Sequence, residues 1–323
     1  MDNTTVLVLA NPTEPQLAML EQLPETTSLA VGNNLEAFEN TARTADVIFN
    51  WSLSGALLRE VFQLCPRVQW VHNRSAGLDG VLFPEIVASP VPLTNGSGVF
   101  SPSLGEFALA SILYFAKDLR RMIRSQEAGR WEQFDITEIT GQTVGIVGYG
   151  DIGRAVATRV RAMGMRVLAV KRHGPPIYNV DPLVSQIYAP DRLHEMLPQC
   201  DYVVVSAPLT HETKGMIDTA AFGVMKPTAV LINVGRGPVV DEQALISALS
   251  MNIIKGAALD VFDQEPLPEG HPLYKLQNVL LSPHCADHTP DWLERAMQFF
   301  IDQFGRFTKG EPLMNIVDKH LGY

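Results

Sequence analysis

The segment TVGIVGYGDIG, residues 143–153, decides the fold of this chain. An apolar strand runs into a GxGxxG pattern, and the pattern in turn opens a helix. In that context the glycines predict the phosphate-binding turn of a dinucleotide-binding βα unit. The first glycine allows the tight turn, the second lets backbone approach a pyrophosphate, and the third lets helix and strand pack closely. The cofactor contacts predicted in this turn are Gly148, Gly150, Asp151, Ile152 and Gly153.

Downstream of this turn, apolar runs alternate with helical patterns. Together with the first strand they make six predicted strands, the number in a full dinucleotide-binding sheet. Helices are predicted between most of the strands. The predicted strands cover residues 143–148, 166–171, 202–207, 229–234, 257–262 and 279–282, and the clearest helices 153–163 and 242–251.

A similar alternation precedes the turn and predicts a second parallel sheet covered by helices. It is followed by one long helix at 104–126, and a last helix at 292–307 is expected to cross back onto this sheet. The predicted strands are 5–10, 47–51, 68–72 and 91–95, with helices at 17–23 and 57–64.

We therefore expect an α/β chain with two domains. A Rossmann-type doubly wound parallel sheet would bind the cofactor over residues 103–288. A flavodoxin-like, discontinuous substrate domain would be formed by residues 1–102 and 289–323. Small ligands commonly bind in the cleft between two such domains.

Composition restricts the partners and the compartment. The 323 residues carry a formal net charge of −10, which argues against nucleic acid or an anionic membrane as the main partner. The three cysteines, Cys65, Cys200 and Cys285, are far apart, so no metal site or disulfide framework is predicted. The N-terminus lacks the basic and apolar regions of a signal peptide, and we expect a cytoplasmic protein.

The end of the second strand of the cofactor sheet indicates which dinucleotide binds. NAD-binding sheets usually place an acidic residue there to hold the ribose 2′-hydroxyl. Here the strand runs into Lys171, Arg172 and His173, with no carboxylate. Cationic groups at this position suit a 2′-phosphate, because a guanidinium binds phosphate through a planar fork. The sequence therefore predicts NADP, with NADPH preferred over NADH.

Three later strand ends carry the candidate catalytic residues Arg236, Glu265 and His284. Ligands of open α/β sheets bind at the carboxyl ends of the strands. A histidine can transfer a proton near neutral pH, and a carboxylate can orient the imidazole and stabilise its charged form. An arginine can grip a substrate carboxylate. This set predicts the interconversion of a 2-keto acid and a 2-hydroxy acid.

With these motifs in order, the sequence resembles the D-isomer-specific 2-hydroxyacid dehydrogenase family over essentially its whole length. The resemblance rests on the glycine turn, on residues 233–242, on Asp260-Val261-Phe262 with Glu265-Pro266, and on Ser282-Pro283-His284. It implies that Arg236 binds the substrate carboxylate and that Glu265 and His284 form the acid–base pair. It also implies a homodimer built largely on the long helix that follows the first domain.

The resemblance implies further contacts. Asp260 would contact the nicotinamide carboxamide, and Pro208 would lie along the cofactor. The backbone amides of Ala76 and Gly77 would meet the substrate carboxylate, unless that loop is a plain turn. Trp51 occupies a position similar to an aromatic residue of the glyoxylate/hydroxypyruvate reductase branch, although an ordinary core tryptophan fits the pattern almost equally well.

The expected reaction is NADPH-dependent reduction of a small 2-keto acid such as glyoxylate or hydroxypyruvate. Two alternatives stay open at this stage. One is a dehydrogenase for bulkier branched or aromatic 2-keto acids. The other is a nucleotide-sensing corepressor on the same fold. The chain also departs from the family pattern at Asp287, which either supports the charged form of His284 or faces solvent.

Overall fold

The computed structural model describes residues 3–172 and 181–323. The chain divides into two compact units, a first unit of Met1–Phe100 with Thr289–Tyr323 and a second unit of Ser101–His288. The division lies within two residues of the boundary expected at 102. His173, one of the predicted cofactor contacts, lies outside the described residues. Across the part of the chain that is described, no helix is long and apolar enough to cross a bilayer.

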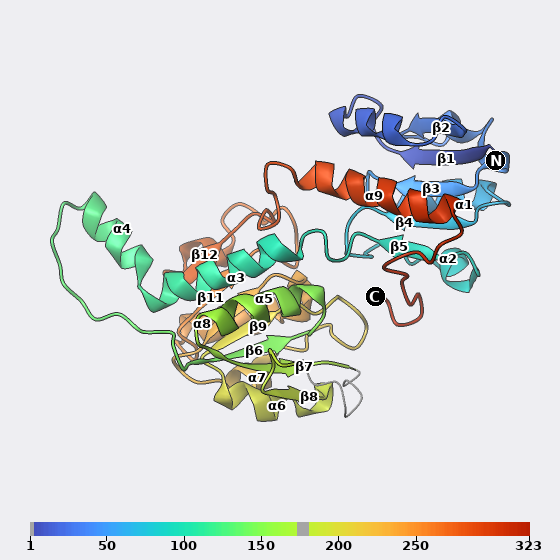
Figure 1. Cartoon of the computed structure of the whole chain (residues 1–323). Helices are drawn as coiled ribbons and strands as arrows, with labels where there is room; N and C mark the ends of the chain where they lie inside the picture. Colours follow the sequence, from blue (N-terminus) through green and yellow to red (C-terminus); the bar gives the residue numbers. More distant parts are fainter. Residues whose placement is uncertain (1–2, 173–180) are drawn as a thin grey trace. The chain divides into compact units, whose positions relative to one another are not determined.

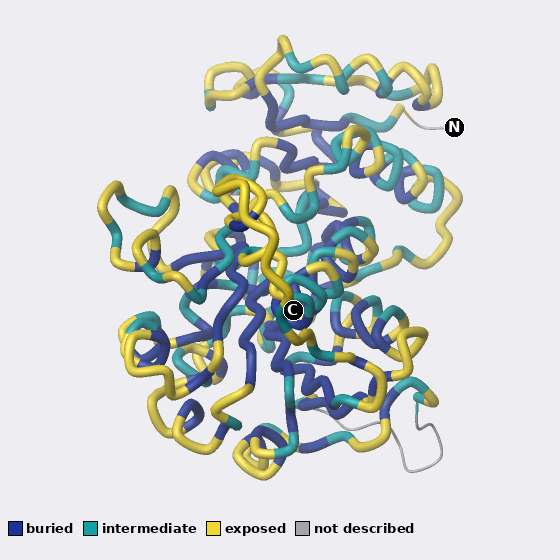
Figure 2. Tube along the Cα trace, turned by 90° about the vertical axis from the view of Figure 1, so that its left-hand side faces the viewer, coloured by how far each residue is buried: buried dark blue, intermediate teal, exposed yellow. Residues whose placement is uncertain are grey.

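The first unit is built on a five-stranded parallel sheet with the order β2-β1-β3-β4-β5 (Figure 1). This is the flavodoxin-like order, as expected. Figure 2 shows its central strands as buried, because both faces are covered. The strands are β1 (Thr4–Leu9), β2 (Thr27–Gly32), β3 (Val47–Asn50), β4 (Trp70–Asn73) and β5 (Leu93–Asn95).

The C-terminal helix α9 (Trp292–Thr308) packs on this sheet. Its Phe300 stacks on Phe49 of β3, with 3.9 Å between the ring centroids, and lies 5.5 Å from Trp70 of β4. The shorter helices are α1 (Gly55–Leu64) and α2 (Pro84–Ala88), and the segments η1 (Pro15–Gln22), η2 (Glu36–Phe38) and η3 (Ala42–Thr44) are 3-10 helices.

The second unit contains a seven-stranded parallel sheet with the order β12-β11-β10-β9-β6-β7-β8. Counted from β6, this is the 3-2-1-4-5-6 order of a Rossmann sheet with one strand added beyond the sixth. The strands are β6 (Thr143–Val147), β7 (Arg166–Val170), β8 (Gln186–Tyr188), β9 (Tyr202–Val205), β10 (Val230–Asn233), β11 (Gly256–Leu259) and β12 (Val279–Leu281).

Helices of the second unit other than α4 cover this sheet (Figure 1), and Asp218 and Asp241 cap α7 (Thr219–Val224) and α8 (Glu242–Ser250) by accepting backbone N–H groups. The helices are α3 (Ser101–Ala116), α4 (Leu119–Glu127), α5 (Asp151–Ala162), α6 (Leu193–Met196), α7 (Thr219–Val224) and α8 (Glu242–Ser250), with 3-10 segments η4 (Pro190–Arg192), η5 (Leu197–Gln199), η6 (Gly237–Val239) and η7 (Pro272–Lys275).

Three details differ from the sequence prediction. The edge strands β2 and β8 were not expected, so the second sheet has seven strands rather than six. The helix predicted at 104–126 is two helices, because Asp118 takes a left-handed backbone conformation (φ 49°) between α3 and α4. Aspartate tolerates this conformation better than most residues.

Candidate active site

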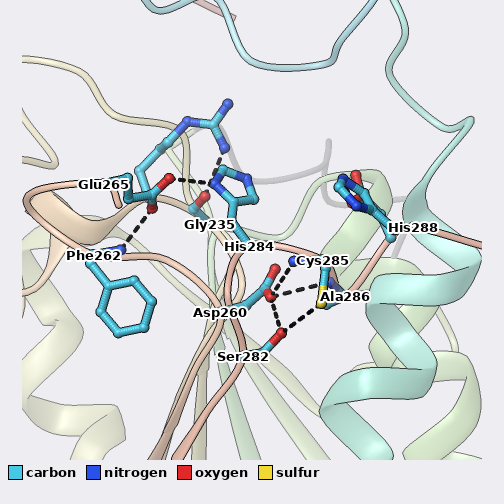
Figure 3. Close-up of polar contacts among 11 residues, drawn as sticks. Gly235, Asp260, Phe262, Glu265, Ser282, His284, Cys285, Ala286 and His288 are labelled. Carbon is cyan, nitrogen blue, oxygen red and sulfur yellow. Dashed lines mark hydrogen bonds and ion pairs between the residues drawn. The ribbon is translucent and has the colours of Figure 1, made fainter. Parts of the chain in front are cut away.

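Three adjacent strands of the second unit end beside one another, and each is followed by one of the predicted catalytic residues. Arg236 follows β10, Glu265 lies in the loop after β11, and His284 follows β12. Figure 3 shows Glu265 and His284 facing each other. Because β10, β11 and β12 are parallel neighbours, their carboxyl ends share one edge of the sheet. These residues are up to 48 positions apart in the sequence, and the sheet places all three at the same edge.

Glu265 and His284 form a short hydrogen-bonded pair. His284 Nδ1 lies 2.6 Å from Glu265 Oε2, and Glu265 Oε1 accepts the backbone N–H of Phe262 at 2.9 Å. Both carboxylate oxygens are therefore held in place. The His284 side chain is 44% exposed and the Glu265 side chain is 34% exposed, so the pair lies at the surface of its unit. Since Nδ1 is engaged by the carboxylate, Nε2 is the ring nitrogen that can serve a substrate.

Asp260 organises the turn that carries His284. This carboxylate is only 1% exposed, and its Oδ1 accepts the Ser282 hydroxyl at 2.6 Å and the backbone N–H groups of Cys285 and Ala286 at 3.0 and 3.1 Å. These bonds fix the backbone on both sides of His284, which adopts a positive φ of 52°. Residues other than glycine adopt this conformation uncommonly, and the bonds from Asp260 hold it in place here.

Arg236 extends from a turn that is also internally bonded. Asn233, at the end of β10, accepts the Gly235 N–H at 3.1 Å and donates its amide to the Arg236 carbonyl at 3.1 Å. The guanidinium donates through Nη1 to the Gly235 carbonyl at 2.8 Å. Gly237 follows because a Cβ there would lie 2.0 Å from the Phe262 carbonyl group. The turn thus packs against the loop that leads to Glu265.

The glycine turn after β6 has the shape that a dinucleotide needs. Gly148 has φ 94°, and a Cβ there would lie 2.5 Å from the Ala207 backbone. A Cβ on Gly153 would lie 2.6 Å from the Gly148 carbonyl oxygen. A Cβ on Gly150 would meet nothing within 4 Å, so the space beside the start of α5 is open. A pyrophosphate fits this open space at a helix N-terminus, with Asp151 and Ile152 in the first turn.

The end of β7 presents the two described residues of the predicted basic patch. Lys171 is exposed, and its backbone N–H donates to the Tyr188 carbonyl at 3.1 Å. Arg172 is mostly buried and forms an ion pair with Glu212 at 2.7 Å. Pro208, after β9, is exposed, and its carbonyl accepts the Thr213 hydroxyl at 2.6 Å. The residues present therefore fit a dinucleotide along the edge formed by β6, β7 and β9.

The predicted substrate-binding residues of the first unit lie close in sequence to buried polar groups. Trp51 is fully buried; its indole N–H is bonded to the Glu14 carboxylate, and the Arg74 guanidinium lies 4.7 Å from its ring centroid. This is the geometry of a core tryptophan with a polar edge. Its predicted contact with substrate stays a prediction.

The loop that contains Ala76 and Gly77 is fixed by asparagine side chains. Asn95 donates to the Ala76 carbonyl at 2.8 Å, and Asn73 donates to the Gly77 carbonyl at 3.0 Å. The Ser75 hydroxyl also donates to Gly77, at 3.0 Å. These hydrogen bonds to the Ala76 and Gly77 carbonyls fix the backbone conformation of the loop.

Sequence reasoning missed the groups that hold the site together. Nothing in the sequence pattern marks Asn233 or Ser282 as partners of the catalytic turns.

Asp287 was singled out in the sequence, and burial raises the pKa of its carboxyl, with a further rise from the nearby Asp260. Its Oδ1 lies 3.7 Å from His288 Nε2. Asp287 is therefore partly withdrawn from solvent rather than fully solvated.

Comparison with known proteins decides the family. A sequence model of the D-isomer specific 2-hydroxyacid dehydrogenase NAD binding domain matches residues 109–286, which span the glycine turn and all three catalytic strand ends. The chain belongs to the D-isomer specific 2-hydroxyacid dehydrogenase family. Curated relatives of this dehydrogenase include glyoxylate reductases of Korarchaeum cryptofilum and Pyrococcus furiosus. Each is 34% identical; the alignments cover 81% and 83% of this chain and 80% and 81% of the relatives.

Solved structures agree with this assignment over the whole dehydrogenase. A family member from Xanthobacter autotrophicus, in complex with NADPH and MES, is 29% identical with a TM-score of 0.85 and covers 100% of both chains. An NADPH-dependent glyoxylate/hydroxypyruvate reductase from Sinorhizobium meliloti, in complex with NADP and sulfate, is 27% identical with a TM-score of 0.85 and covers 99% of this chain and all of that one. The Rossmann and flavodoxin-like fold predicted from sequence is thereby confirmed.

Proposed function

We propose that this dehydrogenase uses NADPH to reduce a small 2-keto acid, of the glyoxylate or hydroxypyruvate type, to the D-2-hydroxy acid. The observation that carries the proposal is the 2.6 Å Glu265–His284 pair beside Arg236 at three neighbouring strand ends. The relatives named as glyoxylate reductases support the substrate class. The cations after β7, and neighbours solved with NADPH or NADP, support the cofactor.

Each residue has a distinct role in this proposal. Bound NADPH supplies the hydride that C2 of the keto acid receives. Protonated His284 gives the proton on Nε2 to the carbonyl oxygen as it becomes an alcohol. Glu265 holds the ring through Nδ1 and stabilises the positive charge before transfer. Arg236 binds the substrate carboxylate through a charge-assisted hydrogen bond. The amides of Ala76 and Gly77 are proposed to add a second contact to that carboxylate.

The first experiment measures turnover of glyoxylate, hydroxypyruvate, pyruvate, 2-ketoisocaproate and phenylpyruvate, each with NADPH and with NADH. Highest kcat/KM with NADPH on glyoxylate or hydroxypyruvate, with D-glycerate formed from hydroxypyruvate, is the expected result. Preference for a bulky keto acid would move the substrate and keep the mechanism. No turnover with any pair, together with intact cofactor binding, would overturn the enzymatic proposal in favour of a nucleotide-sensing protein.

The catalytic role is tested by His284→Ala. Loss of a general acid typically lowers turnover by about 10²-fold or more. NADPH affinity, measured by fluorescence titration, should stay within about two-fold, because the predicted cofactor contacts other than Asp260 follow β6, β7 and β9. Near-wild-type turnover in this variant would remove His284 from the mechanism.

The cofactor role of the basic patch is tested by Lys171→Asp combined with Arg172→Ser. This change removes two cations at the proposed 2′-phosphate position and should weaken NADPH much more than NADH. If the KM for NADPH and the KM for NADH are both the same in the variant as in wild type, the patch does not recognise the 2′-phosphate.

We also propose a cytoplasmic homodimer. The three cysteines are free thiols, which suits a reducing compartment, and the cytoplasmic location can be checked by cell fractionation.

For the dimer, α4 and the segment after it expose Leu119, Met122, Ile123 and Trp131, the last at 94%. Exposed apolar groups on one segment are typical of an interface. Ile123→Glu should halve the mass in light scattering, and an unchanged mass would remove α4 from the interface.

A further inference from the structure

The ion pair between Arg172 and Glu212 crosses the cofactor edge of the second unit. Arg172 follows β7, and Glu212 lies in the loop after β9. Both strands are direct neighbours of β6, which carries the glycine turn. All three strands are parallel, so their following loops share one edge of the sheet. A bond from Arg172 to Glu212 therefore passes across the end of β6, where a Rossmann sheet receives the adenosine half of a dinucleotide.

We propose that Glu212 is the counter-ion that sets how strictly this enzyme prefers a 2′-phosphorylated cofactor. The inference rests on the proposed function, in which Lys171 and Arg172 bind the 2′-phosphate of NADPH. Glu212 occupies one edge of the Arg172 guanidinium at 2.7 Å. A 2′-phosphate must therefore share or take over a cation that a carboxylate already holds, whereas a ribose 2′-hydroxyl has no charge to bring into that competition.

Burial shows which partner is fixed and which can yield. The Arg172 side chain is 20% exposed, and the Glu212 side chain is 65% exposed. The guanidinium is thus held by its surroundings, while the carboxylate can turn into solvent at small cost. A phosphate monoester carries about −1.5 to −2 charges near neutral pH, so it outcompetes a single carboxylate for the same guanidinium. Repulsion between the two anions nevertheless reduces the gain.

The loop that presents Glu212 is built to hold that position. Thr213, which follows it, is buried; its hydroxyl donates to the Pro208 carbonyl at 2.6 Å and accepts the Thr210 N–H at 2.8 Å. These bonds close the loop on itself directly after β9. The backbone of Glu212 therefore stays near Arg172 whether or not the carboxylate is engaged. The negative charge of Glu212 then repels a 2′-phosphate that binds to the same guanidinium.

The experiment compares Glu212→Gln with wild type in calorimetric titrations of adenosine 2′,5′-bisphosphate and of 5′-AMP. The matched control is Glu195→Gln. Glu195 also pairs with an arginine, Arg192, at 2.6 Å, and its side chain is 56% exposed, so this variant removes an equivalent surface charge elsewhere in the same unit. Circular dichroism and a melting curve confirm that each variant folds.

Glu212→Gln should bind the bisphosphate about two- to five-fold more tightly than wild type, the range expected for one screened surface charge. Its affinity for 5′-AMP should not change, and Glu195→Gln should match wild type with both probes. The gain should shrink between low salt and about 1 M salt, because exposed charges are screened there. In turnover assays the same variant should show a larger ratio of NADPH to NADH kcat/KM.

Three results would overturn the inference; the first two leave the proposed function standing, and the third also overturns the proposed function. Unchanged or weaker bisphosphate binding in Glu212→Gln, while wild type still prefers the bisphosphate over 5′-AMP, removes the role of Glu212 and leaves NADPH preference intact. Equal weakening of both probes would make Glu212 a direct ribose ligand instead. If wild type binds both probes equally and the Lys171/Arg172 double variant changes neither, the NADPH proposal itself fails.

Discussion

His72 offers a sharp test of how the first unit is stabilised. It lies on β4 and is fully buried, with Nδ1 2.7 Å from the Thr94 hydroxyl. Its Nε2 has no hydrogen-bond partner among the described residues. Aromatic rings surround the imidazole, including Phe49 and Phe300 with centroids at 5.5 and 5.7 Å. Burial lowers the pKa of His72 to about 3, since this pocket cannot solvate a charge.

The magnitude follows from proton linkage. An unfolded histidine has a pKa of about 6.5, so below that pH residue 72 binds a proton in the unfolded chain but not in the folded chain. Stability is therefore lost as pH falls, at up to about 1.4 kcal/mol per pH unit. Between pH 7 and pH 5 the contribution of His72 is a loss of about 2 kcal/mol. That figure holds for any folded pKa below about 4, because the folded side chain stays neutral throughout this range.

The assay is urea unfolding of wild type and His72→Asn at pH 7, 6 and 5, followed by tryptophan fluorescence. Trp51, Trp70 and Trp292 lie in the first unit, and Trp131, in the other unit, is 94% exposed, so emission reports mainly on the unit that contains His72. Asparagine keeps an amide near the Thr94 hydroxyl and carries no charge. His320→Asn, at an exposed position of the same unit, is the control.

The variant is expected to be less stable than wild type at pH 7, because it loses ring packing. The gap should then narrow by about 2 kcal/mol at pH 5, since only in wild type does proton binding at residue 72 stabilise the unfolded chain. The control should follow wild type at every pH. A gap that stays constant from pH 7 to pH 5 would show that His72 does not reject its proton in the folded protein, and the reasoning from burial would be refuted.

Three further outcomes are expected. Glu265→Gln should lower kcat by about 10-fold or more, because the charge that stabilises protonated His284 is lost, while NADPH affinity measured by titration stays the same. Gly148→Ala should abolish cofactor binding or folding, measured by titration and melting, because φ 94° and a Cβ 2.5 Å from Ala207 leave no space. Lys319→Met should lower the stability of the first unit in the fluorescence assay by about 1–3 kcal/mol, because three backbone carbonyls lose their shared donor.

The sequence predicts those parts of the fold whose residues repeat a strong local pattern. Buried central strands read as continuous apolar runs, so β3, β6, β9 and β10 were located to within a few residues. The edge strands β2 and β8 escaped because most of their residues are partly or fully exposed, so neither forms a continuous buried apolar run. The break between α3 and α4 rests on a single backbone conformation at Asp118, which no periodicity reveals.

The candidate site divides along a similar line. Arg236, Glu265 and His284 could be proposed from their residue types and from their places after strands. The interactions that fix them could not, because each joins residues far apart in the chain. Asp260 is the clearest case: its buried carboxylate holds the turn around His284, whereas sequence reasoning assigned it only to the nicotinamide. The Arg172–Glu212 pair is invisible in sequence for the same reason.

The two halves of the second sheet separate chemistry from cofactor choice. The proton-transfer pair and Arg236 follow β10, β11 and β12, whereas the glycine turn, Arg172 and Glu212 follow β6, β7 and β9. The Arg172–Glu212 pair and the Glu265–His284 pair have no residue in common and follow different strands of the sheet. Changes at Glu212 should therefore alter cofactor selectivity without lowering kcat at saturating NADPH. Changes at Glu265 should lower kcat without altering that selectivity, because sites that share no partners contribute nearly independently.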